Sequence, residues 1–245
     1  MSLPVNSQLP RGILLDLDDT ILDDSGTIEP CWRHACRSAQ LDVGADPDAL
    51  YRAIERTRAW FWSDPERHRM GRLDLDAAAR AIVVQSLEDL GARDAGMADR
   101  IAATYRHERV AALQPLPNAL DTVRWLRERG CRLALVTNGA AAMQTDKISR
   151  FGLRELFESI SIEGELGFGK PDPRIYARAL REIDVAAADA WMVGDHLEFD
   201  IAQPQRMGLL GVWIDGSGAG VPAASAVRPD RILRRLSDLR SPGGP

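Results

Sequence analysis

The stretch GILLDLDDTILDD, residues 12–24, decides how this chain folds. Its first half is apolar, as in a strand that is buried on both faces, and carboxylates follow at Asp16, Asp18 and Asp19. Several negative charges at the end of a buried strand repel one another, which costs free energy unless a cation offsets them. The stretch therefore predicts a first strand over residues 12–18 with a charge-compensating site at its end.

The composition of the 245 residues indicates a globular chain and excludes several classes of function. Hydrophobic residues make up 45% of the chain, which is enough for a sizeable core in one large domain or in one domain that carries an insertion. The net charge of −5 and the lack of a Lys/Arg block argue against binding to nucleic acid or to an anionic membrane. An anionic substrate would need locally placed cations.

Two further features point to the cytoplasm. The N-terminal stretch MSLPVNSQLPRG lacks a basic region followed by an apolar one, so we expect no signal peptide, and no apolar run is long enough to span a bilayer. Cys31, Cys36 and Cys131 have neither metal-site nor disulfide-framework spacing. Free thiols in a reducing, cytoplasmic compartment are the expectation.

The hydrophobic periodicity changes twice along the chain. Residues 29–113 are helical in pattern throughout, whereas helix and strand patterns alternate from residue 114 onward. The later strands are expected within residues 131–139, 157–165, 190–195 and 209–215. Asp46 and Asp172, each followed by a proline, are expected to cap helices at their N-termini.

This alternation predicts an α/β fold, with a Rossmann-like parallel sheet core that carries helices on both faces. The helical segment after the first strand is then an insertion. We expect an α/β core domain over residues 1–24 and 113–245, and an all-helical cap domain over residues 25–112.

Polar side chains stand at or near the expected carboxyl ends of the strands. The set consists of Asp16, Asp18, Thr137, Asn138, Lys170, Asp195 and Asp200. In open α/β sheets, ligands bind beyond the carboxyl ends of the strands. Carboxylates at this density are most simply offset by a hard divalent cation with oxygen ligands, and Mg²⁺ is the usual choice with phosphate substrates. We expect Mg²⁺ bound by Asp16 and Asp195.

Four short motifs resemble those of the haloacid dehalogenase-like (HAD) superfamily. They are DLDDT at 16–20, LVTNG at 135–139, GKPDP at 169–173 and VGDHLEFD at 193–200, in the superfamily's order and with its spacing. The similarity covers the core from 12 to 24 and from about 113 to 225, and residues 25–110 are similar to the superfamily's helical cap, inserted after the first motif. The chain is identified as a HAD-like phosphatase on this resemblance.

The resemblance implies roles for the aspartates. Asp16 would be the nucleophile that forms an aspartyl-phosphate, and Asp18 would protonate the leaving oxygen and later activate water. The Asp16 carboxylate, the main-chain carbonyl of Asp18 and Asp195 would hold Mg²⁺. Asp200 would support the metal site without binding the ion directly.

The same resemblance implies a phosphate-binding set. Thr137 and the backbone N–H groups after it would hydrogen-bond the phosphoryl oxygens, and Asn138 is grouped with them as substrate-binding. Lys170 would neutralise charge on Asp16 and on the group being transferred.

The expected function is Mg²⁺-dependent hydrolysis of a small phosphorylated metabolite, such as phosphoglycolate, a sugar phosphate or a nucleoside monophosphate. Asp18 favours a phosphatase over a dehalogenase of the same fold, because a departing halide needs no proton. A phosphomutase and a non-catalytic binding module remain as alternatives.

Some residues in or near the motifs have a plainer interpretation. Asp19 alternates away from the catalytic side, and His196 is expected to be structural or solvent-facing. Pro204 is tolerated only in the first turn of a helix or at a kink, so the helix after Asp200 should start late or bend. The aromatic and arginine-rich residues 56–72 either contact a nucleotide or sugar phosphate or pack against other cap helices, and no site residue is assigned there.

Overall fold

The structure is a computed structural model that describes residues 9–43 and 46–240. The first eight residues of the N-terminal stretch considered above lie outside the described residues. So does the tail at 241–245, which the sequence predicts to be frayed.

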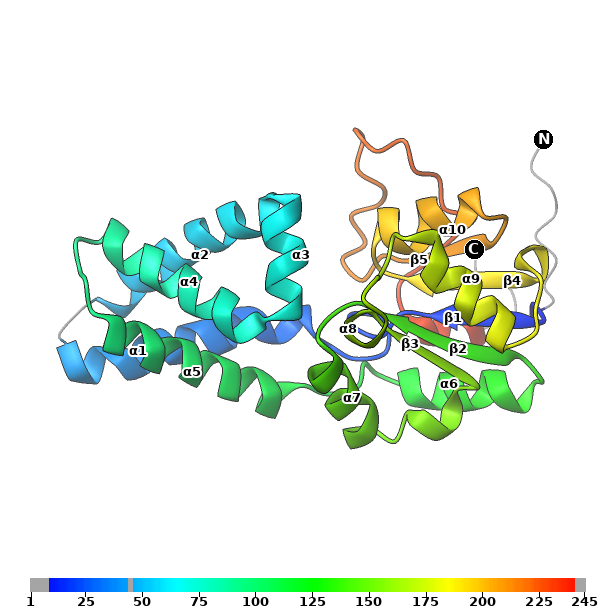
Figure 1. The fold of residues 1–245 in the computed structure, drawn as a ribbon, viewed down its shortest axis with the longest axis horizontal. Coiled ribbons are helices and arrows are strands. Elements are labelled where there is room, and N and C mark those ends of the chain that lie inside the picture. Colours follow the sequence, from blue (N-terminus) through cyan, green and yellow to red (C-terminus); the bar gives the residue numbers. More distant parts are fainter. Residues whose placement is uncertain (1–8, 44–45, 241–245) are drawn as a thin grey trace. The chain divides into compact units, whose positions relative to one another are not determined.

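A six-stranded parallel sheet forms the core of the fold (Figure 1). The strands are β1 (Gly12–Leu15), β2 (Arg132–Thr137), β3 (Ser159–Ile162), β4 (Ala190–Gly194), β5 (Leu210–Ile214) and β6 (Arg231–Leu233). Their order in the sheet is β3-β2-β1-β4-β5-β6, so β1 lies between β2 and β4. Leu15 is in register with Leu135 and Val193, which brings the carboxyl ends of three strands to one edge. The predicted α/β fold with a parallel sheet is confirmed.

The sequence did not predict β6. This strand has only three residues, and Ile232 in its middle is 44% exposed. It lies at the edge of the sheet in the stretch PDRILRR, where charged residues interrupt the apolar pattern. An exposed edge strand needs no long apolar run, so periodicity gives little signal for it.

Helices cover both faces of the sheet, as predicted. The helices after the insertion are α6 (Ala119–Glu128), α7 (Ala141–Arg150), α8 (Glu163–Leu166), α9 (Pro173–Glu182) and α10 (Gln203–Arg206). In Figure 1, α6 and α7 lie on one side of the sheet, and α9 and α10 lie on the other. Ile175 and Tyr176 of α9 share a buried cluster with Leu14 and Met192 of the sheet. The Asp172 side chain caps α9 by accepting a hydrogen bond from Arg174 N, as predicted.

Among the described residues, five α-helices follow β1 before α6 and form the insertion, which confirms the predicted helical insertion. They are α1 (Ile28–Val43), α2 (Pro47–Ser63), α3 (Pro65–Leu73), α4 (Leu75–Asp89) and α5 (Ala95–Ala112). Asp46 caps α2, as expected. The insertion has its own core, in which the rings of Trp32 and Tyr105 stack with centroids 3.6 Å apart. None of the described helices has both the length and the apolar character to cross a bilayer.

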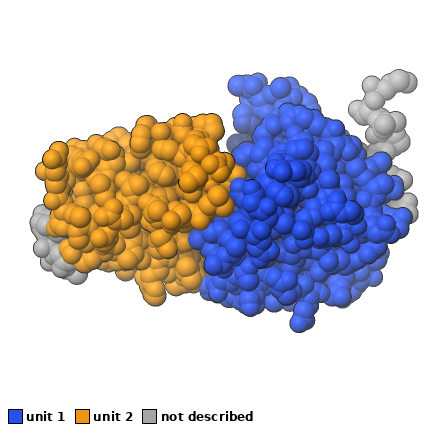
Figure 2. Space-filling model, in the orientation of Figure 1, with its two compact units in different colours: residues 1–23, 115–245 blue, residues 24–114 orange. Residues whose placement is uncertain are grey.

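The chain divides into two compact units, residues 1–23 with 115–245 and residues 24–114, coloured separately in Figure 2. Within the first unit, the segments that precede and follow the insertion are hydrogen-bonded to each other. Leu116 N donates to Ile21 O at 2.8 Å, and Leu22 forms an antiparallel bridge with Pro115. The outgoing and returning chains therefore run side by side.

The helix around Pro204 starts late, as the sequence predicts. Residues Leu197–Ala202 form a wide π-helical turn, and α-helical geometry begins only at Gln203, with Pro204 in the first turn of α10. Proline has no N–H to donate, so it fits at a helix start and not in an interior turn.

Truncation of Ile13 on β1 should test how much the sheet core stabilises the fold. Ile13 is fully buried, so Ile13→Ala should lower the free energy of unfolding by about 2–5 kcal/mol through lost burial and a cavity. The matched control is Ile232→Ala, at a half-exposed position of the same sheet, which should cost about 1 kcal/mol or less. Urea unfolding followed by circular dichroism measures both, and equal losses would contradict this account.

Candidate active site

Asp16 stands directly after β1 and is held at the sheet edge. Its main-chain N–H donates to Val193 O at 3.0 Å, so the residue still belongs to the β-ladder with β4. Its side chain points into the protein and the residue is only 6% exposed. The carboxylate accepts hydrogen bonds from Lys170 Nζ at 2.5 Å and from Thr20 Oγ1 at 3.4 Å.

Lys170 supplies a buried positive charge to this edge. The residue is 3% exposed, and its ammonium also donates to Asp200 Oδ1 at 2.7 Å. Burial lowers the pKa of Lys170, but the facing carboxylates of Asp16 and Asp200 raise it by more, so the net pKa shift is upward. Lys170 is therefore a permanent cation between two aspartates.

Asn138 fixes the main chain of Lys170. Its side-chain oxygen accepts from Lys170 N at 2.7 Å, and its Nδ2 donates to Lys170 O at 2.8 Å. The sequence grouped Asn138 with the substrate-binding residues, whereas the structure places its amide on the backbone of the lysine loop. The end of β2 is thereby tied to the residue that faces Asp16.

Three carboxylates gather at the edge of the sheet. Those of Asp16, Asp195 and Asp200 each offer an oxygen, and these oxygens lie within 4.8 Å of one another. Asp200 is fully buried and accepts a hydrogen bond from His196 N at 3.0 Å. Gly194 makes room for it, because a Cβ at position 194 would lie 2.3 Å from the Asp200 carboxylate.

The electrostatics of this cluster fit a divalent cation. Burial raises the pKa of Asp16 to about 7, against the opposing effect of Lys170, and burial together with the charges of Asp16 and Asp200 raises the pKa of Asp195 to about 8. When ionised, three carboxylates against one ammonium leave two negative charges. Oxygen donors with this charge and spacing are the ligands that Mg²⁺ prefers.

The carboxylate of Asp18 has a different environment from that of Asp16. It accepts from Lys147 Nζ at 2.7 Å and from Gln144 Nε2 at 3.0 Å. Gln144 also donates to Thr137 Oγ1 at 2.6 Å, so one amide links Asp18 to the threonine at the end of β2. Thr137 itself is 1% exposed.

The sequence analysis did not single out Gln144 and Lys147. Both lie on α7, three residues apart and therefore on one face of the helix. The spacing puts both side chains on one face of a helix that follows the strand ending in Thr137, but it does not say which strand end that face meets.

Two residues within the motifs have structural contacts. Asp19 adopts a left-handed backbone conformation with φ 58°, and its N–H donates to Leu22 O at 2.7 Å. His196 is exposed, its ring stacks on Phe199 with centroids 3.8 Å apart, and its Nδ1 accepts from Phe199 N. Trp213 on β5 donates its indole N–H to Asp195 O at 2.7 Å and so fixes the loop of that carboxylate.

The parallel sheet, the helical insertion after its first strand and the aspartate cluster at its carboxyl edge place the chain among α/β proteins whose ligands bind beyond the carboxyl ends of the strands. The family model of haloacid dehalogenase-like hydrolases matches residues 10–208 of this sequence. The chain belongs to this family, which confirms the resemblance of the four motifs.

Curated relatives cover most of the chain. It is 31% identical to the glyceraldehyde 3-phosphate phosphatase of Methanopyrus kandleri over 83% of each chain. It is 31% identical to the phosphoserine phosphatase of Thermus thermophilus over 93% of this chain and 96% of the relative. These named relatives are both phosphatases.

Solved structures share the fold. The magnesium-bound HAD-hydrolase YfnB of Bacillus subtilis superposes with a TM-score of 0.72 at 22% identity, covering 95% of this chain and 98% of that one. The 2-haloacid dehalogenase of Pseudomonas syringae has a TM-score of 0.60 at 27% identity, with 95% and 97% coverage.

The raised pKa values predict how magnesium should stabilise the protein. Without metal, the folded state holds protons on Asp16 and Asp195 more tightly than the unfolded state does, so their contribution to stability is lost as the pH rises from about 4 through about 8. Magnesium binds the ionised carboxylates. It should therefore raise the melting temperature by several degrees at about pH 8.5 and by little at about pH 5.

Differential scanning fluorimetry with Mg²⁺ or EDTA across this range measures the effect. Asp195→Asn should remove most of the magnesium-dependent shift, whereas Asp19→Asn should keep it. A magnesium effect of the same size at both ends of the range would show that the carboxylate cluster is not the binding site.

Proposed function

We propose that this protein is a Mg²⁺-dependent phosphatase that hydrolyses a small phosphorylated metabolite through a covalent intermediate on Asp16. The observation that supports it most is the buried carboxylate of Asp16, which faces Lys170 and shares a cluster with Asp195 and Asp200. The phosphatase activities named for the relatives support the reaction class.

In the first half of the reaction, an ionised Asp16 oxygen attacks the phosphorus atom. The bond between phosphorus and the ester oxygen breaks, and the phosphoryl group remains on Asp16 as an aspartyl-phosphate. Asp18 gives its proton to the departing ester oxygen, so the product leaves as an alcohol.

In the second half, the Asp18 carboxylate takes a proton from water. The resulting hydroxyl oxygen attacks phosphorus, the bond to Asp16 breaks, and inorganic phosphate leaves with Asp16 restored as a carboxylate. Asp18 is again protonated, ready for the next ester.

Other residues offset or contact the negative charge of the nucleophile and of the phosphoryl group. Lys170 favours the ionised form of Asp16 and would offset negative charge on the phosphoryl group. The Thr137 hydroxyl, at the end of β2, would contact a phosphoryl oxygen. Mg²⁺, held by Asp16, Asp195 and the main-chain carbonyl of Asp18 with Asp200 beside them, would reduce repulsion between an anionic nucleophile and an anionic phosphate.

The position of Asp18 favours this function over dehalogenation. A halide needs no proton on departure, so a dehalogenase has no use for an acid held by Lys147 and Gln144 beside the nucleophile. A cytoplasmic location is part of the proposal. Its support is that Cys31, Cys36 and Cys131 are free thiols, all buried.

Replacement of the nucleophile should abolish turnover. Asp16→Asn keeps the shape of the side chain but removes its charge, so hydrolysis of p-nitrophenyl phosphate in Mg²⁺ should fall by roughly 1,000-fold or more. Asp19→Asn, the same substitution three residues away, should stay within a few-fold of wild type.

Each alternative function predicts a different outcome, which is measured with its own substrate. Chloride release from 2-chloropropionate would indicate a dehalogenase. Phosphate moved between positions of a sugar phosphate without release would indicate a mutase. No turnover of a broad phosphate panel by wild type in Mg²⁺ would favour a binding module, and retained activity in Asp16→Asn would remove Asp16 as nucleophile.

Lys147 should position Asp18 for protonation of the leaving group. Lys147→Met removes the ion pair at 2.7 Å, and we expect kcat for alkyl phosphates to drop about 10- to 100-fold with little change in KM. The loss should be smaller for p-nitrophenyl phosphate, whose phenolate leaves without a proton. Lys147→Arg, which keeps the charge, should recover much of the rate. An equal loss for both kinds of substrate would contradict this role.

A further inference from the structure

Glu163 is a buried acid that has no role in the chemistry proposed above. It follows β3 directly, so it stands at the carboxyl end of that strand, yet it is only 5% exposed. Thr137 is in register with Ile162, which places Glu163 next to the turn that follows Thr137. Burying a carboxylate costs free energy unless hydrogen bonds compensate. A hydrogen-bond donor to this carboxylate lies in that turn.

The carboxylate of Glu163 holds the turn after β2. Its Oε2 accepts a hydrogen bond from Gly139 N at 3.0 Å, and Gly164 N donates to Gly139 O at 3.0 Å. Both polar groups of the Gly139 main chain are therefore bonded to the segment after β3. The resemblance implies that N–H groups after Thr137 bind phosphoryl oxygens, but the N–H of Gly139 is already donated to Glu163.

The same side chain packs against the loop that carries Lys170. Gly169 directly precedes the lysine, and a Cβ at position 169 would lie 2.7 Å from both Cγ and Cδ of Glu163. Only glycine leaves room for the acid there. Asn138 binds the main chain of Lys170 through two hydrogen bonds, so the turn after β2 is already joined to this loop. Glu163 contacts both of the segments that Asn138 joins.

We propose that Glu163 is a positioning residue for phosphoryl transfer, which holds the turn after β2 and the loop that carries Lys170 in one arrangement. This inference rests on the proposed phosphatase function, in which Thr137 and Lys170 contact the phosphoryl group. Glu163 acts through the two segments and not on the reacting atoms. A displacement of about 1 Å in the groups that hold a reacting centre can lower the rate about 100-fold.

Three substitutions of Glu163 separate the length of the side chain from its charge. Glu163→Leu removes the acceptor, Glu163→Asp keeps the charge on a side chain that is one methylene shorter, and Glu163→Gln keeps the length and an acceptor oxygen. In Mg²⁺, kcat/KM for p-nitrophenyl phosphate should fall about 10- to 100-fold in the first two and stay within a few-fold of wild type in Glu163→Gln. Glu163→Asp also covers the case in which Glu163→Leu does not fold.

The loss should be the same for alkyl phosphates and for p-nitrophenyl phosphate, because every ester presents the same phosphoryl group to Thr137 and Lys170. This distinguishes Glu163 from Lys147, whose replacement should affect alkyl phosphates more. A loss that depends on the leaving group, a rate in Glu163→Gln as low as in Glu163→Leu, or a normal rate in Glu163→Leu would overturn the proposal.

Asp215 provides a matched control for the loss of a buried acid. It follows β5 directly, is 5% exposed, and accepts hydrogen bonds from Gly218 N and Gly220 N at 2.8 Å each. Asp215→Leu should lower the melting temperature about as much as Glu163→Leu does, while kcat/KM of the folded protein stays within a few-fold of wild type. Equal rate losses in the two variants would show that reduced stability alone explains the effect of Glu163.

Amide hydrogen exchange, followed by NMR on the full chain, tests the positioning without turnover. The Gly139 amide should exchange slowly in wild type and in Glu163→Gln, and about 10-fold faster or more in Glu163→Leu. The Lys170 amide should become faster with it, because the two segments are joined. Fast exchange of the Gly139 amide in wild type, or an unchanged Lys170 amide in Glu163→Leu, would overturn the proposal.

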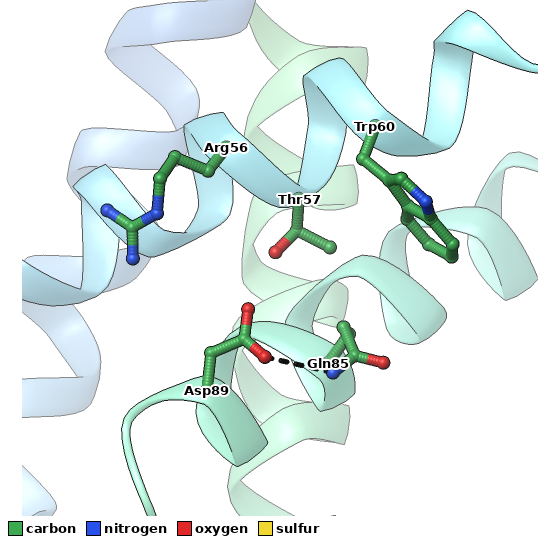
Figure 3. Close-up of a pocket in the computed structure, with 5 residues that line it drawn as sticks. All are labelled: Arg56, Thr57, Trp60, Gln85 and Asp89. Carbon is green, nitrogen blue, oxygen red and sulfur yellow. Dashed lines mark hydrogen bonds between the residues drawn. The ribbon is translucent and has the colours of Figure 1, made fainter.

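The helical unit supplies a control for the exchange measurement. Figure 3 shows a groove in this unit, of about 240 Å³, where Gln85 Nε2 donates to Asp89 Oδ1 at 3.0 Å. Gln85→Leu removes that bond and should leave the exchange of the Gly139 amide as in wild type.

The exchange measurement also separates this proposal from the phosphatase proposal. Asp16→Asn, which removes turnover, should exchange as wild type does. A wild-type protein without turnover, in which Glu163→Leu still speeds exchange at Gly139, would remove the phosphatase function and the catalytic purpose of Glu163 together. Normal turnover in Glu163→Leu would remove the positioning role alone.

Discussion

The site depends on one buried ammonium group. Lys170 Nζ lies between the carboxylates of Asp16 and Asp200, in a place where none of the three side chains has much access to water. Removing charged groups from water costs several kcal/mol for each ion unless opposite charges and hydrogen bonds compensate. The surrounding fold keeps the three charged groups in contact. Asn138 holds the backbone of Lys170, and Gly194, which has no side chain, leaves room for Asp200. The remaining excess of negative charge is what makes the edge a cation site.

Asp16 and Asp18, two residues apart, lie in different electrostatic environments. Asp16 is placed among other carboxylates, where burial raises its pKa, and Asp18 is paired with Lys147 outside that cluster. Enzymes that need a nucleophile and a separate acid or base often assign different environments to chemically identical groups. Here the separation comes from the sheet and α7, because the strand end directs Asp16 inward while the helix reaches over to Asp18. Gln144 then connects the second aspartate to Thr137, so the two are oriented together.

The sequence was most informative where chemistry and periodicity coincide. The parallel sheet, the helical insertion and the proline-marked helix starts at Asp46 and Asp172 followed from local patterns, because each depends on burial or capping within a few residues. The motifs also led to the carboxylates that gather at the sheet edge. Contacts made by ordinary helix residues did not follow, since nothing in the spacing of Gln144 and Lys147 says which strand end they face. The engagement of Asn138 with the lysine loop and the short edge strand β6 are likewise products of tertiary packing.

The chain leaves the sheet-bearing unit and returns to it at adjacent positions, and this has a consequence for how such proteins can diverge. Ile21 and Leu22 are bonded to Leu116 and Pro115, so the two ends of the intervening segment are already neighbours within the sheet-bearing unit. A tight turn of a few residues could join these two ends at a small cost in loop entropy, and the pairing of the strands would stay intact. Genetic exchange at these two joints can therefore replace the whole of α1 to α5 by a segment of another length or architecture. Such an exchange would leave the six strands and the carboxylates of Asp16, Asp195 and Asp200 in place.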